Sequence, residues 1–111
     1  MRRAKIYYKS ALAGILSEEE SGYRFVYDNE YLRQPDAPPI SLTMPTSKTV
    51  YESNILFPFF DGLIPEGWLL DISVKNWKLD PRDRMGLLLT CCRDCIGGVS
   101  VEDITNEEES L

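Results

Sequence analysis

The sequence predicts an α+β domain in which a small antiparallel sheet of four to five strands is followed by two to three helices packed on it. Short segments rich in β-branched and aromatic residues fill the first part of the chain, and proline-initiated segments with helical periodicity fill most of the second. The 111 residues suffice for one hydrophobic core and are too few for two. A hydrophobic content of 43% with 27% charged residues argues against an intrinsically disordered chain.

Four strands are expected in the first part of the chain: Ala4 to Tyr8, Ala11 to Leu16, Tyr23 to Tyr27 and Ile40 to Met44. The first two flank a tight turn at Lys9-Ser10 and therefore form a hairpin. In the third, aromatic residues alternate with Arg24 and Val26, which gives a half-buried strand with an aromatic face.

A short helix and an irregular segment separate the third and fourth strands. Asp28 is the expected N-cap of the helix, which ends near Leu32. Residues 34–39 are rich in proline, which removes backbone donors and holds the preceding residue in an extended conformation. We therefore expect no regular structure there.

Helical segments are expected from Ser53 to Leu63 with an interruption at Pro58, from Pro65 to about Trp77, and from Pro81 to Cys92. Asp80 is the expected N-cap of the last helix, with Asp83 at its N3 position. After Gly97-Gly98, Val99 to Val101 read as a final strand that returns to the sheet. The expected domain spans residues 1–101, and residues 102–111 form an acidic C-terminal tail whose composition suits a free chain end.

The charge distribution argues against autonomous nucleic-acid binding. The chain has 18 acidic and 12 basic residues, and five of the acidic ones lie in the last ten positions, so the body is almost neutral. Binding to nucleic acid draws much of its free energy from phosphate neutralisation, which such a body cannot supply. We interpret the basic residues Arg2, Arg3, Lys5 and Lys9 as solvated charge beside an edge strand, and Glu18-Glu19-Glu20 as another solvated run.

The expected location is the cytoplasm. The N-terminus lacks the apolar run of a secretory signal, and no stretch approaches the ~20 apolar residues of a membrane span. The odd number of cysteines, three, agrees with a reducing compartment.

The side chains available for catalysis are few, and we expect no enzymatic activity, no cofactor and no metal. The chain contains no His, which excludes a Ser-His-Asp triad, and it lacks both a G-x-x-x-x-G-K-[ST] and a G-x-G-x-x-G motif. Cys92 and Cys95 form a C-x-x-C pair behind a helix, where the helix dipole disfavours a thiolate. A redox enzyme using these thiols is the alternative, and it predicts a strongly depressed thiol pKa.

The helix expected from Pro65 carries a candidate for partner binding. Leu70, Val74 and Trp77 form one apolar stripe, and Trp68 points about 180° away from Trp77. An outward Trp68 has the profile of an interface anchor, whereas packing on the preceding Phe57 to Phe60 segment is an equally good interpretation.

The block Leu56-Phe57-Pro58-Phe59-Phe60 holds more apolar surface than one face of a short helix can bury, so part of it is expected at an exposed patch. The candidate partner-binding residues are Trp68, Ile72, Glu66, Pro65, Phe59 and Asp61.

These segments resemble the N-terminal subdomain of HipA-type toxin kinases. The resemblance rests on Tyr31-Leu32, Ser41-Leu42-Thr43-Met44-Pro45, the block from Leu56 through Asp61 to Trp68, Leu79 to Asp83, and Arg93 to Val99. Gly62 stands where Asn is common in this family, and Gly98 where Ala is common.

In that family the catalytic residues lie downstream of this subdomain, so the resemblance implies none here. A stand-alone form resembles the small antitoxins of tripartite HipBST systems. The implied function is to bind and neutralise a HipA-like Ser/Thr kinase of the HipT type, in a complex with a HipB-like helix-turn-helix protein. The alternative is the N-terminal structural subdomain of a longer HipA-type kinase.

Overall fold

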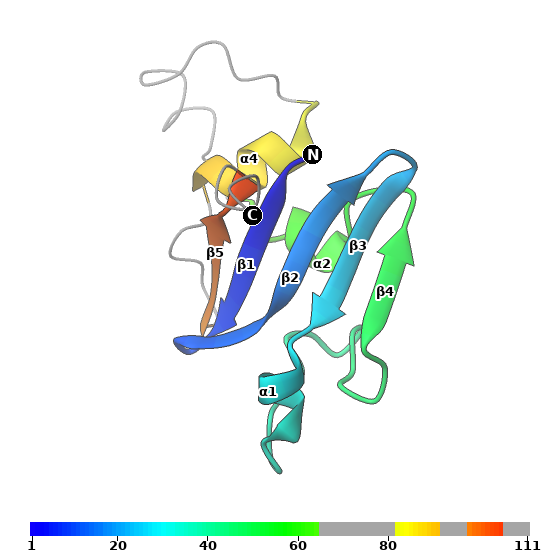
Figure 1. Ribbon diagram of the computed structural model, residues 1–111. Helices are drawn as coiled ribbons and strands as arrows, with labels where there is room; N and C mark the ends of the chain where they lie inside the picture. Colours follow the sequence, from blue (N-terminus) through cyan, green and yellow to red (C-terminus); the bar gives the residue numbers. More distant parts are fainter. Residues whose placement is uncertain (65–81, 92–97, 106–111) are drawn as a thin grey trace.

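The computed structural model describes residues 1–64, 82–91 and 98–105. In this part of the chain five antiparallel strands form one sheet in the order β4-β3-β2-β1-β5 (Figure 1). The strands are β1 (Arg3–Tyr8), β2 (Ala11–Glu19), β3 (Gly22–Tyr27), β4 (Val50–Ser53) and β5 (Val99–Asp103). The helices are α1 (Asn29–Arg33), α2 (Pro58–Asp61) and α4 (Arg84–Cys91), so the predicted α+β class is confirmed.

The hairpin of β1 and β2 turns at Lys9 and Ser10, as predicted. Both residues have positive φ values, 48° and 75°, which is the backbone of a type I′ turn made without the usual Asn-Gly pair. The backbone N–H of Lys9 also donates to the carbonyl of Gly98 (2.7 Å), just before β5. This hydrogen bond therefore connects the turn to the residue that precedes β5.

The strand expected at Ile40 to Met44 is wrong, because these residues form bends and turns. The fourth strand is instead β4, which pairs with β3, and Ser53 ends that strand rather than capping a helix. Ile40 and Met44 are buried, as a strand would require, but their backbone groups bond to the Tyr27 hydroxyl instead of to a neighbouring strand. Ile40 and Met44 are therefore buried without being part of the sheet.

The sequence predicts the N-cap of α1 correctly and that of α4 incorrectly. Asp28 caps α1, accepting from the backbone N–H of Tyr31 (3.2 Å) as expected. For α4 the predicted cap is wrong: the helix begins at Arg84, and the carboxylate of Asp83 accepts from the N–H of Gly86 (3.1 Å), so Asp83 is the N-cap rather than an N3 residue. The helix expected from Pro65 to Trp77 lies outside the described residues.

The basic N-terminus is not beside an edge strand. β1 lies between β2 and β5, and β5 runs two residues further than predicted, so Glu102 and Asp103 belong to the sheet. Tyr7 donates from its hydroxyl to Glu102 across this pair of strands (3.1 Å). The interpretation of the first basic residues as solvated charge is also wrong for Arg2, which bonds to two carboxylates.

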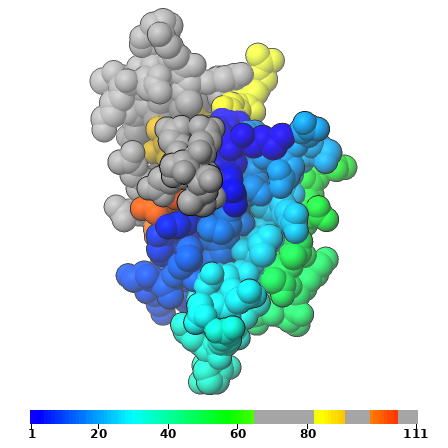
Figure 2. Space-filling view, viewed as in Figure 1, coloured from blue at the N-terminus to red at the C-terminus, as the bar shows by residue number. Residues whose placement is uncertain are grey.

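The core lies between one face of the sheet and the helices α2 and α4, as Figure 1 shows. Side chains alternate along the strands, so Ala4 and Ile6 are buried while Arg3 and Lys5 face the other side. The core contains Ala4, Ile6, Ala13, Leu16, Phe25, Tyr27, Phe60, Met85, Leu87, Leu88, Val99 and Val101. On the opposite face, side chains of β1 to β4 form much of the near surface in Figure 2.

Candidate partner-binding surface

The aromatic block is used mainly for the core. Phe57 and Phe60 are 8% and 0% exposed, and the ring of Phe60 meets that of Phe25 on β3 at 5.7 Å. Pro58 begins α2 at the position where a missing N–H costs nothing, and this orients Phe60 inward. The block therefore joins the helices to the sheet.

What remains at the surface near this block is limited. Phe59 is half-buried, with its ring edge-on to that of Phe60 at 5.2 Å, and Pro58 is exposed. Ile55 is 67% exposed and directly precedes the block. The exposed apolar surface here therefore centres on Ile55 and Phe59 rather than on the whole block.

Asp61 is held by a neighbouring helix. Its Oδ1 accepts from Nε of Arg84 at 2.5 Å, which ties the end of α2 to the start of α4. The side chains are 42% and 39% exposed, so the pair lies at the surface and is open to solvent. The Asp61 carboxylate is thus presented at the surface as part of an ion pair with Arg84.

Four of the six candidate residues, Pro65, Glu66, Trp68 and Ile72, lie outside the described residues, as do Cys92 and Cys95. The structure thus brings Phe59 and Asp61 together on α2 and leaves the others as sequence predictions.

A second surface feature escaped the sequence reasoning. Three tyrosine hydroxyls hold the loop of residues 38–45, here called the tyrosine-held loop. Tyr27 donates to the carbonyl of Met44 and accepts from the N–H of Ile40 (3.1 Å). Tyr31 donates to the carbonyl of Pro38, and Tyr51 to that of Pro45 (2.6 Å). Burial raises the pKa of Tyr27, so its hydroxyl keeps the donated proton.

This loop presents Leu42 at 96% exposure. Within the loop Ser41 Oγ accepts from the N–H of Thr43 (3.2 Å), and the N–H of Met44 donates to the carbonyl of Ser41 (3.0 Å). The side chain of Leu42 therefore projects from a turn fixed at both ends. The signal in the sequence is the alternation of apolar and polar residues between Pro39 and Pro45, the same pattern that predicts a strand.

An ion network also escaped the sequence reasoning. Arg2 donates to both oxygens of Glu18 on β2 (2.9 and 2.7 Å) and to both oxygens of Asp83 at the start of α4 (2.7 and 2.9 Å). These hydrogen bonds lower the pKa of Glu18 and of Asp83 and raise that of Arg2. The Arg2 network thus joins two strands to α4, and Glu18 is not the solvated charge expected.

The model of the HipA N-terminal domain family matches residues 4–102. The chain belongs to the HipA N-terminal domain family. The resemblance stated from the sequence is thereby confirmed, and the match includes α2, α4 and all of β5 except its last residue.

Two proteins are similar to this chain over nearly their whole length. A solved structure described as the N-terminal domain of HipA toxin superimposes with a TM-score of 0.71 at 27% identity, covering 93% of this chain and 92% of that one. An uncharacterised protein of Haemophilus influenzae is 29% identical over 103 residues, which are 93% of this chain and 93% of that protein. The similarity therefore extends over nearly the whole of that protein.

The described residues carry no group of three or more Cys, Asp or Glu side chains able to hold a metal ion. Among the same residues, no helix has the length and apolar character needed to cross a membrane.

Proposed function

We propose that this chain is a non-enzymatic antitoxin that binds a HipA-like Ser/Thr kinase of the HipT type and neutralises it. The observation that carries the proposal is the family match over residues 4–102, which accounts for nearly the whole chain with a HipA N-terminal domain. The Haemophilus influenzae relative supports the stand-alone form, because the matched region covers 93% of it.

In the proposed complex the domain acts in trans on a separate kinase. The surface around α2, with Phe59 and Asp61, is the proposed contact, and the sequence candidates Pro65, Glu66, Trp68 and Ile72 are proposed to contribute to it. Inhibition follows from blocking the productive conformation of the kinase or the access of its substrate. A HipB-like helix-turn-helix protein is the proposed third component, since the nearly neutral body of this domain is poorly suited to binding DNA.

The direct test mixes the purified 111-residue chain with the cognate kinase and follows autophosphorylation. We expect inhibition that saturates at a fixed molar ratio. Undiminished kinase activity at saturating concentration contradicts the antitoxin proposal.

The Trp68→Ala variant tests the proposed anchor. We expect the fold to persist and the kinase affinity to fall by about 2 kcal/mol or more, the loss typical of a buried aromatic hot spot. Isothermal titration calorimetry measures the affinity, and circular dichroism checks the fold. Arg33→Ala, which removes an exposed side chain on α1, is a suitable control. Unchanged affinity in Trp68→Ala would assign this side chain to internal packing.

The second candidate is the N-terminal structural subdomain of a longer HipA-type kinase. It is favoured by the similar solved structure, which is described as a domain of a toxin. The neighbouring reading frame distinguishes the two. A separate kinase gene that lacks this region supports the antitoxin, and a continuous frame supports the subdomain.

A further inference from the structure

The strand β4 lies at an edge of the sheet and pairs with β3 on one side only. No other strand in the described part of the chain pairs with it. The N–H of Tyr27 donates to the carbonyl of Thr49 (2.9 Å), so the backbone groups of Thr49 and Tyr51 face β3. Those of Val50 and Glu52 alternate with them and face away from β3. The outer edge of β4 therefore offers an N–H donor and a carbonyl acceptor from each of these two residues.

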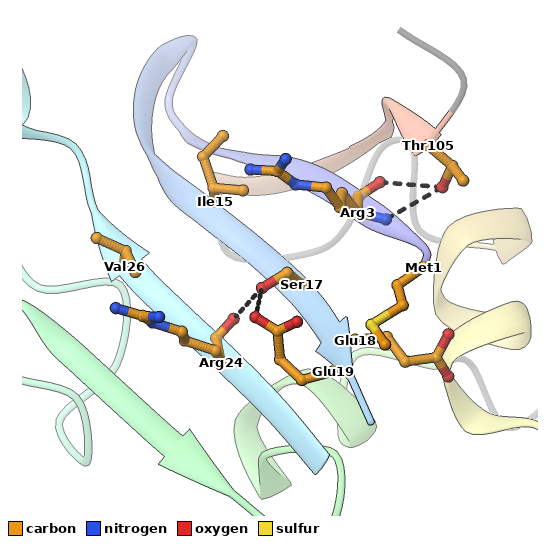
Figure 3. Close-up of a pocket in the computed structure, with 9 residues that line it drawn as sticks. All are labelled: Met1, Arg3, Ile15, Ser17, Glu18, Glu19, Arg24, Val26 and Thr105. Atoms are coloured by element: carbon orange, nitrogen blue, oxygen red, sulfur yellow. Dashed lines mark hydrogen bonds between the residues drawn. The ribbon is translucent and has the colours of Figure 1, made fainter. Parts of the chain in front are cut away.

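An apolar row on the outer face of the sheet ends at this edge. Ile15 pairs with Val26, and Val26 pairs with Val50, so the three side chains lie in one row across β2, β3 and β4. The preceding residue Phe25 is in the core, which places the row on the face turned away from α2, where Figure 3 shows Ile15 and Val26. All three side chains of the row are half-buried.

Two exposed residues of opposite charge flank Val50, namely Lys48 and Glu52. Glu52 is opposite Arg24 on β3 but forms no bond with it, and no other group in the described part of the chain bonds to its carboxylate. The ammonium group of Lys48 lies 5.1 Å from the centre of the Tyr51 ring, an interaction that is weak at an exposed position. Both charges are therefore available to a partner.

A second copy of the chain complements this edge when the two β4 strands pair antiparallel about a two-fold axis. A register that pairs Glu52 with Glu52 of the second copy opposes like charges, and one that pairs Glu52 with Val50 sets a carboxylate against the apolar row. The register that pairs Val50 with Val50 joins the two apolar rows. It also places Glu52 of each copy opposite Lys48 of the other, so it satisfies both the apolar and the charged side chains.

We propose that the chain self-associates through β4, with Val50 opposite Val50 and with Lys48 and Glu52 in two reciprocal ion pairs. The two sheets then form one continuous sheet across the two-fold axis. A strand of four residues buries less surface than a permanent dimer needs, so the association is weak and depends on protein concentration. The contact is independent of the proposed kinase binding.

Analytical ultracentrifugation of the 111-residue chain at concentrations up to about 1 mM, a range that detects weak complexes, tests the proposal. We expect the average mass to rise toward that of a dimer. Lys48→Glu and Glu52→Lys should each weaken association about tenfold, because each change turns two attractive pairs into repulsive ones. The double variant Lys48→Glu/Glu52→Lys exchanges the two charges and should restore association. A parent chain that stays monomeric over this range overturns the proposal.

The control is Asp36→Lys, which makes the same change of charge as Glu52→Lys at an exposed residue after α1 and should leave association unchanged. Circular dichroism checks that each variant is folded. A mixture of the Lys48→Glu and Glu52→Lys chains should associate more strongly than either chain alone, because every Glu then faces a Lys. Association that is unaffected by both single charge reversals overturns the proposed register.

Nuclear magnetic resonance locates the contact. In the parent chain, the amide signals of residues 48–53 should shift as the protein concentration rises. Val50→Pro removes an N–H that faces away from β3, so it should abolish these shifts and leave the pairing with β3 in place. Concentration-dependent shifts confined to other residues overturn the proposal.

Discussion

The tyrosine-held loop and the start of α4 are both held by side chains from distant parts of the sequence, but by different chemistry. The loop is held by three neutral hydroxyls, and two of them belong to the buried residues Tyr27 and Tyr31, which are 1% and 3% exposed. The start of α4 is held by Arg2, Glu18 and Asp83, whose side chains are 33%, 28% and 34% exposed. Buried neutral hydrogen bonds are insensitive to salt and pH, whereas half-exposed ion pairs respond to both. Changes in salt and pH should therefore weaken the ion pairs at the start of α4 but not the buried hydrogen bonds of the loop.

The largest effect is expected from Tyr27→Phe. This change leaves the N–H of Ile40 and the carbonyl of Met44 without their buried partner. Each unsatisfied buried group costs about 1–3 kcal/mol, so we expect a loss of ~3 kcal/mol in the free energy of unfolding. Urea denaturation measures this loss, which should be the same at low and high salt.

Tyr51→Phe is the matched control for that change. Its hydroxyl bonds to Pro45 at an exposed position, where water can replace it, so the loss should stay below about 1 kcal/mol. Equal losses of unfolding free energy in Tyr27→Phe and Tyr51→Phe would show that burial does not determine how much each hydroxyl stabilises the fold.

Arg2→Gln should have a smaller effect. It removes the four charge-assisted hydrogen bonds to Glu18 and Asp83 and leaves those two carboxylates near each other. Because the network is partly exposed, we expect a loss of about 1 kcal/mol at low salt, measured by urea denaturation and reduced in 1 M NaCl. Arg33→Gln breaks the largely exposed pair with Glu30 and should change stability very little. A salt-independent loss in Arg2→Gln would contradict the ionic interpretation.

The same network predicts a pH dependence. Arg2 holds the pKa values of Glu18 and Asp83 below their ordinary values of 4.5 and 3.8, chiefly through side-chain hydrogen bonds. A lowered carboxyl pKa stabilises the fold fully above the unfolded-state pKa, and this stabilisation is lost as the pH falls through the folded-state pKa. The stability difference between the parent chain and Arg2→Gln should therefore be largest near neutral pH and shrink below about pH 4.5. Denaturation curves across this range check the trend, and a difference independent of pH would refute it.

The sequence predicted features that depend on neighbouring residues and missed those that depend on distant ones. The turn at Lys9-Ser10, the Asp28 cap and the returning strand at Val99 all follow from local signals. The segment Ile40 to Met44 was misassigned because a hydroxyl 13 residues earlier satisfies its backbone.

In the candidate site, too, the contacts that the sequence does not predict are those between distant residues. Asp61, a candidate for partner binding, lies at the surface, and its partner Arg84 is 23 residues away in the sequence. The partners of Arg2 are 16 and 81 residues away. Periodicity and capping rules operate within a few residues, so they cannot reveal such pairs.

A small effect on stability is also expected from the pair of Asp61 and Arg84, and this makes it useful for testing the candidate surface. Since both side chains are about two-fifths exposed, Asp61→Asn and Arg84→Gln should each cost less than about 1 kcal/mol of folding free energy. Because both variants should stay folded, their kinase affinities show whether Asp61 binds the kinase or only joins α2 to α4. If Asp61 binds the kinase, Asp61→Asn should weaken the complex more than Arg84→Gln does. Equal, negligible effects of the two variants on affinity would limit Asp61 to joining α2 with α4.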